Sequence, residues 1–159
     1  MRKALAVPIA VGAALLILPG VSAGSRASAQ TYRLSASLNA HQVVTPRNHR
    51  WTPPARLAKA RGSFTGRLTT SSSGRTLHWH ISFAGVGSNP LRIADVHYGK
   101  PGKFGPIVVR LCGPCKAGQS GTKKLKASAA HSISAGATWI TVITGAYPNG
   151  VIRGQIKVS

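Results

Sequence analysis

The chain of 159 residues contains 21 Lys and Arg but a single acidic residue, Asp95, which gives a formal net charge of +20. One carboxyl side chain is too few for the carboxyl pair of a glycosidase or for the acidic oxygens of a calcium-binding loop. The sequence also lacks a Gly-x-Ser-x-Gly nucleophile elbow, a Gly-x-Gly-x-x-Gly fingerprint and a phosphate-binding loop. Most hydrolase mechanisms are therefore excluded, and we expect a protein that is not an enzyme.

Residues 1–29 are predicted to contain a secretory signal peptide. Two basic residues begin it, residues 4–18 form a short apolar run, and small residues follow. The run is shorter than the roughly 20 residues of a membrane span, although a retained N-terminal anchor is the alternative. Cleavage fits after Ala23 or Ala29. We expect residues 30–159 to form one domain without a membrane span, secreted to the extracellular space or associated with the cell envelope.

After residue 30 the sequence predicts short strands separated by Gly, Pro and Ser, with no long helical period. Alternating apolar residues mark a first strand at residues 32–43 and the clearest buried strand at residues 75–85. Between them, Trp51 lies in a Pro-rich loop and is expected to cap the core. Further strands are expected at residues 60–70, 91–98, 106–111, 120–127, 139–144 and 150–158, with one short helical turn within 129–136. Seven to eight such strands predict an all-β sandwich or barrel.

The C-terminal segment is predicted to be a hairpin. Residues 139–144 are rich in β-branched side chains, as in a buried strand, and residues 147–150 (Tyr-Pro-Asn-Gly) have the composition of a loop. Residues 150–158 then alternate with the period of a half-buried strand. Ile152 and Ile156 lie on one face of this strand, and Arg153 lies on the other.

Five motifs of this chain occur together in a known family. They are residues 34–40 (Leu-Ser-Ala-Ser-Leu-Asn-Ala), 62–66, 76–79, the Gly-rich segment 99–109, and residues 148–156 (Pro-Asn-Gly-Val-Ile-Arg-Gly-Gln-Ile). They resemble the CHRD domain, which is named from chordin and is also common as a single secreted bacterial module. The resemblance spans Tyr32 to Val158, and its last motif is the most specific.

The resemblance implies an extracellular, antiparallel Greek-key β-sandwich without established catalysis. Its architecture would be similar to that of immunoglobulin domains and of Cu,Zn superoxide dismutase. In chordin such domains belong to an antagonist of secreted growth factors, and a basic stand-alone module has no evident reason to share that partner.

Departures from the family pattern affect a candidate metal site. Family members usually read Ala-His-Ile-His where this chain has Ala-Asp-Val-His at residues 94–97, and Val-His-Thr where it has Val-Ile-Thr at residues 142–144. The family pattern is similar to the His-x-His metal ligands of Cu,Zn superoxide dismutase.

Asp95 and His97 are therefore candidates for a residual metal site or acid–base pair. Alternatively, Asp95 pairs with His97 or a nearby Arg and holds the 99–105 loop. Two ligands are too few for tetrahedral zinc.

His78 and His80 share one face of their strand, and this spacing suits chelation of a metal. We expect them to be exposed surface histidines. A copper or zinc site there would need His41, His49 or His131 nearby. No cofactor is expected.

The sequence Cys112-Gly-Pro-Cys115 is also the redox motif of thioredoxin, which works at the start of a helix. Residues 116–121 do not favour a helix. We therefore expect Cys112 and Cys115 to form a local disulfide in an exported protein. A small redox or metal-binding protein using this pair, or Asp95 and His97, is the alternative function.

The excess of basic residues favours binding to polyanions, although a surface tuned for solubility explains it equally well. Basic residues are denser in two stretches, which supply the candidate polyanion-binding residues: Arg47, Arg50, Arg56, Lys59 and Arg61, and Lys123, Lys124 and Lys126. No aromatic residue alternates with the Lys cluster and no base-reading motif is present, so specific nucleic-acid binding is not expected. We expect a monomeric binding or adhesion module whose partners are anionic cell-envelope polymers or an extracellular protein.

Overall fold

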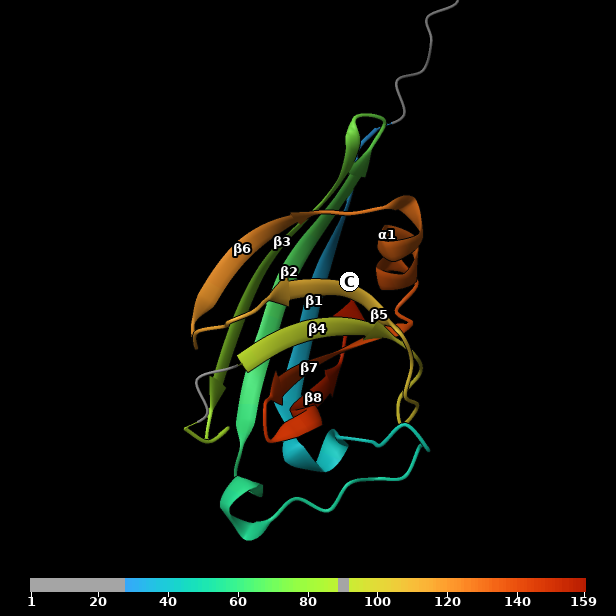
Figure 1. Cartoon of the computed structure of the whole chain (residues 1–159). Helices are drawn as coiled ribbons and strands as arrows, with labels where there is room; N and C mark the ends of the chain where they lie inside the picture. Colours follow the sequence, from blue (N-terminus) through green and yellow to red (C-terminus); the bar gives the residue numbers. More distant parts are fainter. Residues whose placement is uncertain (1–27, 89–91) are drawn as a thin grey trace, which may run out of the picture.

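The computed structural model describes residues 28–88 and 92–159 (Figure 1). The apolar run of the predicted signal peptide and the first cleavage point, Ala23, lie outside the described residues. So does Leu91, where a strand was expected to begin. Within the described part of the chain, no helix has the length and apolar character needed to cross a bilayer.

The described residues form strands, one short α-helix and two 3-10 helices. In chain order these are β1 (Gln30–Asn39), η1 (Ala40–Gln42), η2 (Ala55–Leu57), β2 (Arg61–Ser71), β3 (Gly74–Ala84), β4 (Arg92–Tyr98), β5 (Ile107–Cys112), β6 (Gln119–Lys124), α1 (Ala127–Ser134), β7 (Thr138–Thr144), β8 (Tyr147–Gln155) and β9 (Lys157–Val158).

The strands form one antiparallel sheet in the order β5-β4-β7-β8-β1-β2-β3-β6, and β9 also pairs with β1 (Figure 1). The sheet curves into a nearly closed, barrel-like shape. A single register pair, Asn39 with Arg153, joins β8 to β1. The prediction of an all-β, antiparallel fold is confirmed. The finer prediction of a Greek-key sandwich is not confirmed, because the pairing runs without a break from β5 to β6.

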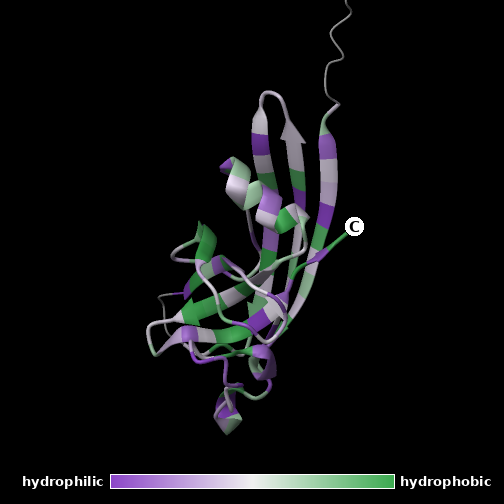
Figure 2. Cartoon of the chain, turned by 90° about the vertical axis from the view of Figure 1, so that its right-hand side faces the viewer, coloured by the Kyte–Doolittle hydropathy of each residue, from purple (hydrophilic) through white to green (hydrophobic). Residues whose placement is uncertain are grey.

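The inner face of the sheet forms the core, as the alternation in β3 predicted. Leu77, Trp79, Ile81 and Phe83 are all buried, and the residues between them are mostly exposed. Figure 2 shows the same alternation of hydrophilic and hydrophobic residues along the long strands. The core also takes in side chains from the neighbouring strands and from α1, among them Leu34, Leu38, Phe64, Leu68, Ala130, Ile133, Ile140, Val142 and Ile152.

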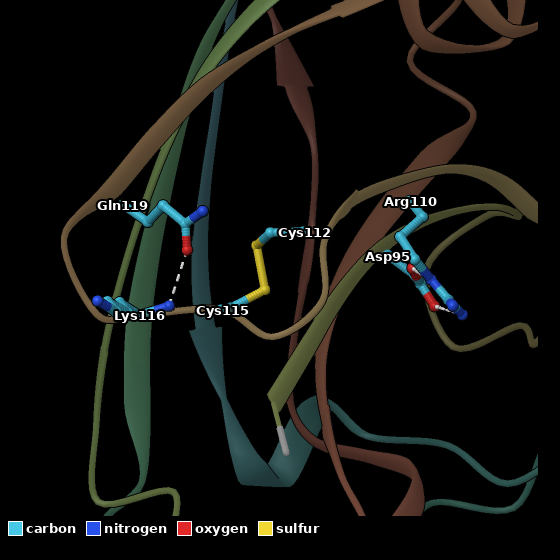
Figure 3. The surroundings of a disulfide bond; sticks show 6 residues. All are labelled: Asp95, Arg110, Cys112, Cys115, Lys116 and Gln119. Carbon is cyan, nitrogen blue, oxygen red and sulfur yellow. Dashed lines mark hydrogen bonds and ion pairs between the residues drawn. A yellow bond between two sulfur atoms is a disulfide. The ribbon is translucent and has the colours of Figure 1, made fainter. Parts of the chain in front are cut away.

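The two edge strands, β5 and β6, are consecutive in the chain, and a disulfide links the last residue of β5 to the segment that joins them. Cys112 and Cys115 are bonded, as predicted, and both are buried in the core (Figure 3). The Cys115 N–H donates to the carbonyl of Arg92 over 2.7 Å, which attaches this segment to the start of β4. The backbone N–H of Lys116 donates to the Gln119 side chain over 2.8 Å and closes the turn into β6. The pair is therefore followed by a strand and not by a helix.

The C-terminal hairpin differs from its prediction. Its turn is at residues 145–146, because Tyr147 already pairs with Thr144 at the start of β8. Pro148 and Asn149 lie within β8, next to a register irregularity. Gly150 has a φ of 109°, which places it in a region that favours glycine and lets the strand accommodate the irregularity.

Three other boundaries also differ. The first strand ends at Asn39 and is followed by η1, where the Asn39 side chain accepts a hydrogen bond from the N–H of Gln42 over 3.1 Å. β6 ends at Lys124, and α1 has eight residues where one turn was expected.

Trp51 does pack against the core as predicted, with its ring centroid 5.6 Å from that of Tyr147.

Candidate binding face

The outward face of the sheet has a bare part and a covered part. The bare part consists of β1, β2, β3 and β6, which expose alternate side chains. In the covered part, the 99–105 loop contacts side chains of β4, β7 and β8, namely His97, Trp139 and Arg153. The 43–54 loop meets this covering loop (Figure 1), where the N–H of Phe104 donates to the side chain of Asn48 over 2.8 Å. The covered part was not predicted, because the alternation in residues 150–158 suggested one buried face. In β8, Val151 to Gly154 are all buried, so both faces of the strand are covered.

The covered part is built around Trp139 of β7. The ring of His97, from β4, is stacked on it with centroids 4.2 Å apart and an interplanar angle of 9°. The guanidinium carbon of Arg153, from β8, lies 3.8 Å from the Trp139 ring centroid. Since β4 and β8 flank β7 on opposite sides, the indole is held between an imidazole and a guanidinium. Phe104 from the covering loop closes this cluster, 5.9 Å from Trp139.

Asp95 is fully buried and pairs with Arg110 of β5, one of the partners considered from the sequence (Figure 3). The Nε and Nη2 atoms of Arg110 donate to the carboxylate over 3.0 and 3.3 Å. This hydrogen bonding and the carboxylate charge raise the pKa of Arg110. Arg110 is largely exposed, so the pair joins a buried acid to a base at the surface. Asp95 thus links β4 to the edge strand.

His97 holds the 99–105 loop. Its Nδ1 lies 2.8 Å from the carbonyl oxygen of Gly105, and burial lowers its pKa despite that hydrogen bond and the nearby charge of Asp95. Its Nε2 is buried and has no hydrogen-bond partner among the residues that the structure describes. Asp95 and His97 therefore have separate partners, Arg110 and Gly105.

The predicted metal-site residues are not brought together. His78 and His80 lie on β3, and four strands separate β3 from β4, which carries Asp95 and His97. His78 Nδ1 lies 3.0 Å from the Thr122 hydroxyl, and His80 Nδ1 lies 2.9 Å from that of Ser120. Within residues 28–88 and 92–159, no three side chains of His, Cys, Asp or Glu are grouped as metal ligands would be.

The candidate polyanion-binding residues lie toward opposite ends of the bare part. Arg61 pairs with Ala84 at one end of β3, whereas Lys124 pairs with Thr76 toward the other. At the rise of a β-strand these positions are about 27 Å apart. The first group lies in and after the 43–54 loop and consists of Arg47, Arg50, Arg56, Lys59 and Arg61. The second lies at the end of β6 (Lys123 and Lys124) and just before α1 (Lys126). The two groups do not form one patch.

The bare part instead brings together two arginines that sequence reasoning did not single out. Arg33 of β1 and Arg67 of β2 are directly opposite, and the same row continues to His78 and Thr122. The next row is Ser35, Thr65, His80 and Ser120. Only strand pairing places these residues side by side, because Arg33 and Arg67 are far apart in the sequence.

Three adjoining hollows on this face form what we call the outer groove. The first, of about 690 Å³, is lined by Arg33, Arg67, His78 and His80 among others. The second, of about 450 Å³, shares Thr65 with the first and has three serines in its lining, Ser35, Ser37 and Ser63. The third, of about 360 Å³, shares Gln42 and Gln155 with the second and reaches Arg50 and Arg153. From Arg33 to Asn39 along β1, the groove spans about 20 Å.

Arg153 is the most unusual group in the groove. Only 3% of its surface is exposed, and burial lowers its pKa to about 10. Its Nη2 donates to the carbonyl of Lys103 over 2.7 Å. The sequence held one signal for this site, an arginine within the apolar, glycine-containing segment 150–156. Such a composition is also compatible with a strand that is buried on both faces.

A known protein family matches most of the chain. No curated protein and no solved structure matches the chain. The model of the CHRD domain matches residues 34–156, which include every strand from within β1 to the end of β8. The match covers well over half of the sequence, and the chain therefore belongs to the CHRD domain family.

Proposed function

We propose that this CHRD domain is a non-enzymatic binding module, secreted or associated with the cell envelope, that holds an anionic polymer in the outer groove. The observation that carries the proposal is the distribution of charge. Arginines occupy both ends of the groove, while the only acidic side chain of the chain, Asp95, is fully buried. No Asp or Glu side chain at the surface competes for the basic groups.

The pair Arg33 and Arg67 supports a ligand that carries negative charge. Like charges directly opposite on neighbouring strands repel each other and destabilise the sheet. An oxyanion lying between the two guanidiniums would offset this repulsion with charge-assisted hydrogen bonds. The hydroxyls of the second hollow, such as those of Ser35 and Ser63, suit an oxygen-rich polymer that continues along the groove.

The alternative function, a redox or metal protein, receives less support from the geometry. A reactive thiol pair needs exposure and an electropositive setting such as a helix start. Cys112, the last residue of β5, and Cys115, just after it, are both buried and joined in a disulfide. Asp95 and His97 are each engaged elsewhere, by Arg110 and by Gly105.

Binding of the purified protein to immobilised polygalacturonate and polyphosphate, over a series of salt concentrations, tests the proposal. The test variant is Arg33→Ser/Arg67→Ser, and the matched control is Arg47→Ser/Lys59→Ser. Both variants lose two positive charges at exposed positions. We expect the test variant to bind at least about tenfold more weakly near 0.1 M salt and to show a shallower salt dependence, because two ionic contacts are lost.

The control variant should bind almost as well as the unchanged protein. Equal weakening in both variants would mean that net charge alone attracts the polymer and that the groove is not its site. Absence of salt-sensitive binding to either polymer would contradict the proposed function.

A further inference from the structure

Arg153 is a buried cation without a counter-charge. The only acidic side chain in the sequence, Asp95, is paired with Arg110, and burial is the cause that lowers the pKa of Arg153 to about 10. The guanidinium therefore remains charged at neutral pH. A buried charge is costly unless it is paired or hydrogen-bonded.

The protein satisfies this guanidinium only in part. Its Nη2 donates to the carbonyl of Lys103, and its guanidinium carbon lies 3.8 Å from the Trp139 ring centroid, a cation–π contact. The buried Nη1 finds no hydrogen-bond partner among residues 28–88 and 92–159. One strong, positively charged donor is thus left over.

Arg153 lines the third hollow of the groove, together with groups of matching chemistry. Arg50 and His41 line the same hollow, and its lining contains no acidic residue that would repel an anion. Gln155 also lines it and donates through Nε2 to the carbonyl of Gly99 over 3.1 Å. The Oε1 of Gln155 is buried and accepts no hydrogen bond from the described residues. Two residues that line the hollow therefore each have a buried polar atom without a partner among the described residues, a cationic donor in Arg153 and a neutral acceptor in Gln155.

We propose that this hollow is a discrete site for the oxyanion of a small hydroxylated acid. The oxyanion accepts from Nη1 of Arg153 with Arg50 as a second positive charge, and a hydroxyl of the ligand donates to Oε1 of Gln155. The volume of about 360 Å³ is within the range of small-molecule pockets. Carboxylate, phosphate and sulfate groups share this chemistry, either in a free acid or in one unit of a polymer.

The site does not depend on the proposed polymer function, because a free acid needs neither Arg33 nor Arg67. We would titrate the purified protein with glucuronate, inorganic phosphate and inorganic sulfate, using glucose as the neutral control. Calorimetry would measure affinity, and tryptophan fluorescence would report on Trp139, which contacts Arg153. We expect saturable binding of at least one oxyanion and none of glucose.

Two exposed arginines of the same loop provide a matched pair of variants. Arg50→Ser removes a residue that lines the hollow, and Arg47→Ser removes the same charge from a residue that does not. We expect Arg50→Ser to weaken oxyanion binding about fivefold, the effect of one partly exposed ion pair, and Arg47→Ser to leave it almost unchanged. Arg153→Met should abolish binding, and the Arg50 and Arg47 comparison remains decisive if that variant does not fold.

The outcomes separate the two proposals. Loss of polymer binding in Arg33→Ser/Arg67→Ser with retained glucuronate binding would show a discrete oxyanion site that works alone. The pocket assignment would be overturned if no oxyanion binds, if glucose binds as well as glucuronate, or if Arg47→Ser weakens binding as much as Arg50→Ser. Preference for glucuronate over both inorganic ions would indicate that the hydroxyl contact to Gln155 contributes, and the reverse preference would limit the ligand to a bare oxyanion.

Discussion

His97 and Arg153 lie against the same indole ring, and burial lowers the pKa of both side chains. Removal from water disfavours the charged form of each base. The consequences differ because the starting values differ. Arg153 keeps its charge at neutral pH. His97 stays neutral in the folded protein at a pH at which a free histidine would already begin to take up a proton.

The lowered pKa of His97 predicts a loss of stability in mild acid. An unfolded chain takes up a proton at His97 near pH 6.5, while the folded protein does so only at lower pH. Between these two points the unfolded state binds more protons, so the free energy of unfolding falls as the pH falls below about 6.5. In urea unfolding between pH 7.5 and 5.5, we expect His97→Gln to lose less stability on acidification than the unchanged protein.

His78→Gln is the control for this experiment, because His78 is exposed. It should keep the pH dependence of the unchanged protein. If His97→Gln shows that same dependence, His97 is not the group responsible.

At the scale of elements, β8 is the strand on which the sheet depends for its continuity. It pairs with β7 along most of its length but meets β1 at a single register pair. Here Gly154 allows a close approach, since a Cβ atom at this position would lie 2.5 Å from the backbone oxygen of Ser37. A backbone atom cannot move aside without moving β1.

Gly154→Ala should therefore weaken the junction of β8 and β1. We expect a decrease in the free energy of unfolding of about 1–3 kcal/mol, as for other overpacked sites. Gly113→Ala is the matched control, because a Cβ there meets the Ile93 side chain at an ordinary 3.4 Å. Urea unfolding of both variants measures the difference. Equal stability of the two variants would mean that β1 and β8 can separate at little cost.

The strands themselves were largely predictable, and so was the face on which Arg153 lies, but the burial of Arg153 was not. In β3 the apolar period directly identifies Leu77 and Phe83 as core residues. For β8, a period of two residues does not reveal that a second loop covers the opposite face. The open alternatives for Asp95 needed the register of β5, which places Arg110 opposite it. Similarly, Arg33 and Arg67 become a pair only through the alignment of β1 with β2.

The molecule as a whole carries a formal net charge of +20, with very little internal compensation. Such an excess destabilises the compact state by self-repulsion. In the part of the chain that the structure describes, Asp95 and Arg110 form the one ion pair between side chains. Mobile anions from salt must supply the remaining screening.

Added salt should therefore have opposite effects on folding and on polymer binding. We expect the melting temperature to rise between about 0.02 and 0.5 M NaCl, since the Debye length shrinks and repulsion is screened. Affinity for polygalacturonate should fall over the same range, because counterion release contributes less. Measuring thermal unfolding and polymer binding on the same sample tests both the expected rise in melting temperature and the expected fall in affinity. The rise in melting temperature should be smaller in Arg33→Ser/Arg67→Ser, and a falling melting temperature would contradict this view.

The burial of Asp95 has a consequence for experiments in acid. With the sole carboxyl side chain enclosed and paired, acidification meets no Asp or Glu on the exterior to neutralise. Lysine and arginine stay protonated throughout this range, and exposed histidines can only add to the charge. Affinity lost on acidification while the protein stays folded would thus report the ionisation of the bound polymer, because the positive charge of the protein does not fall.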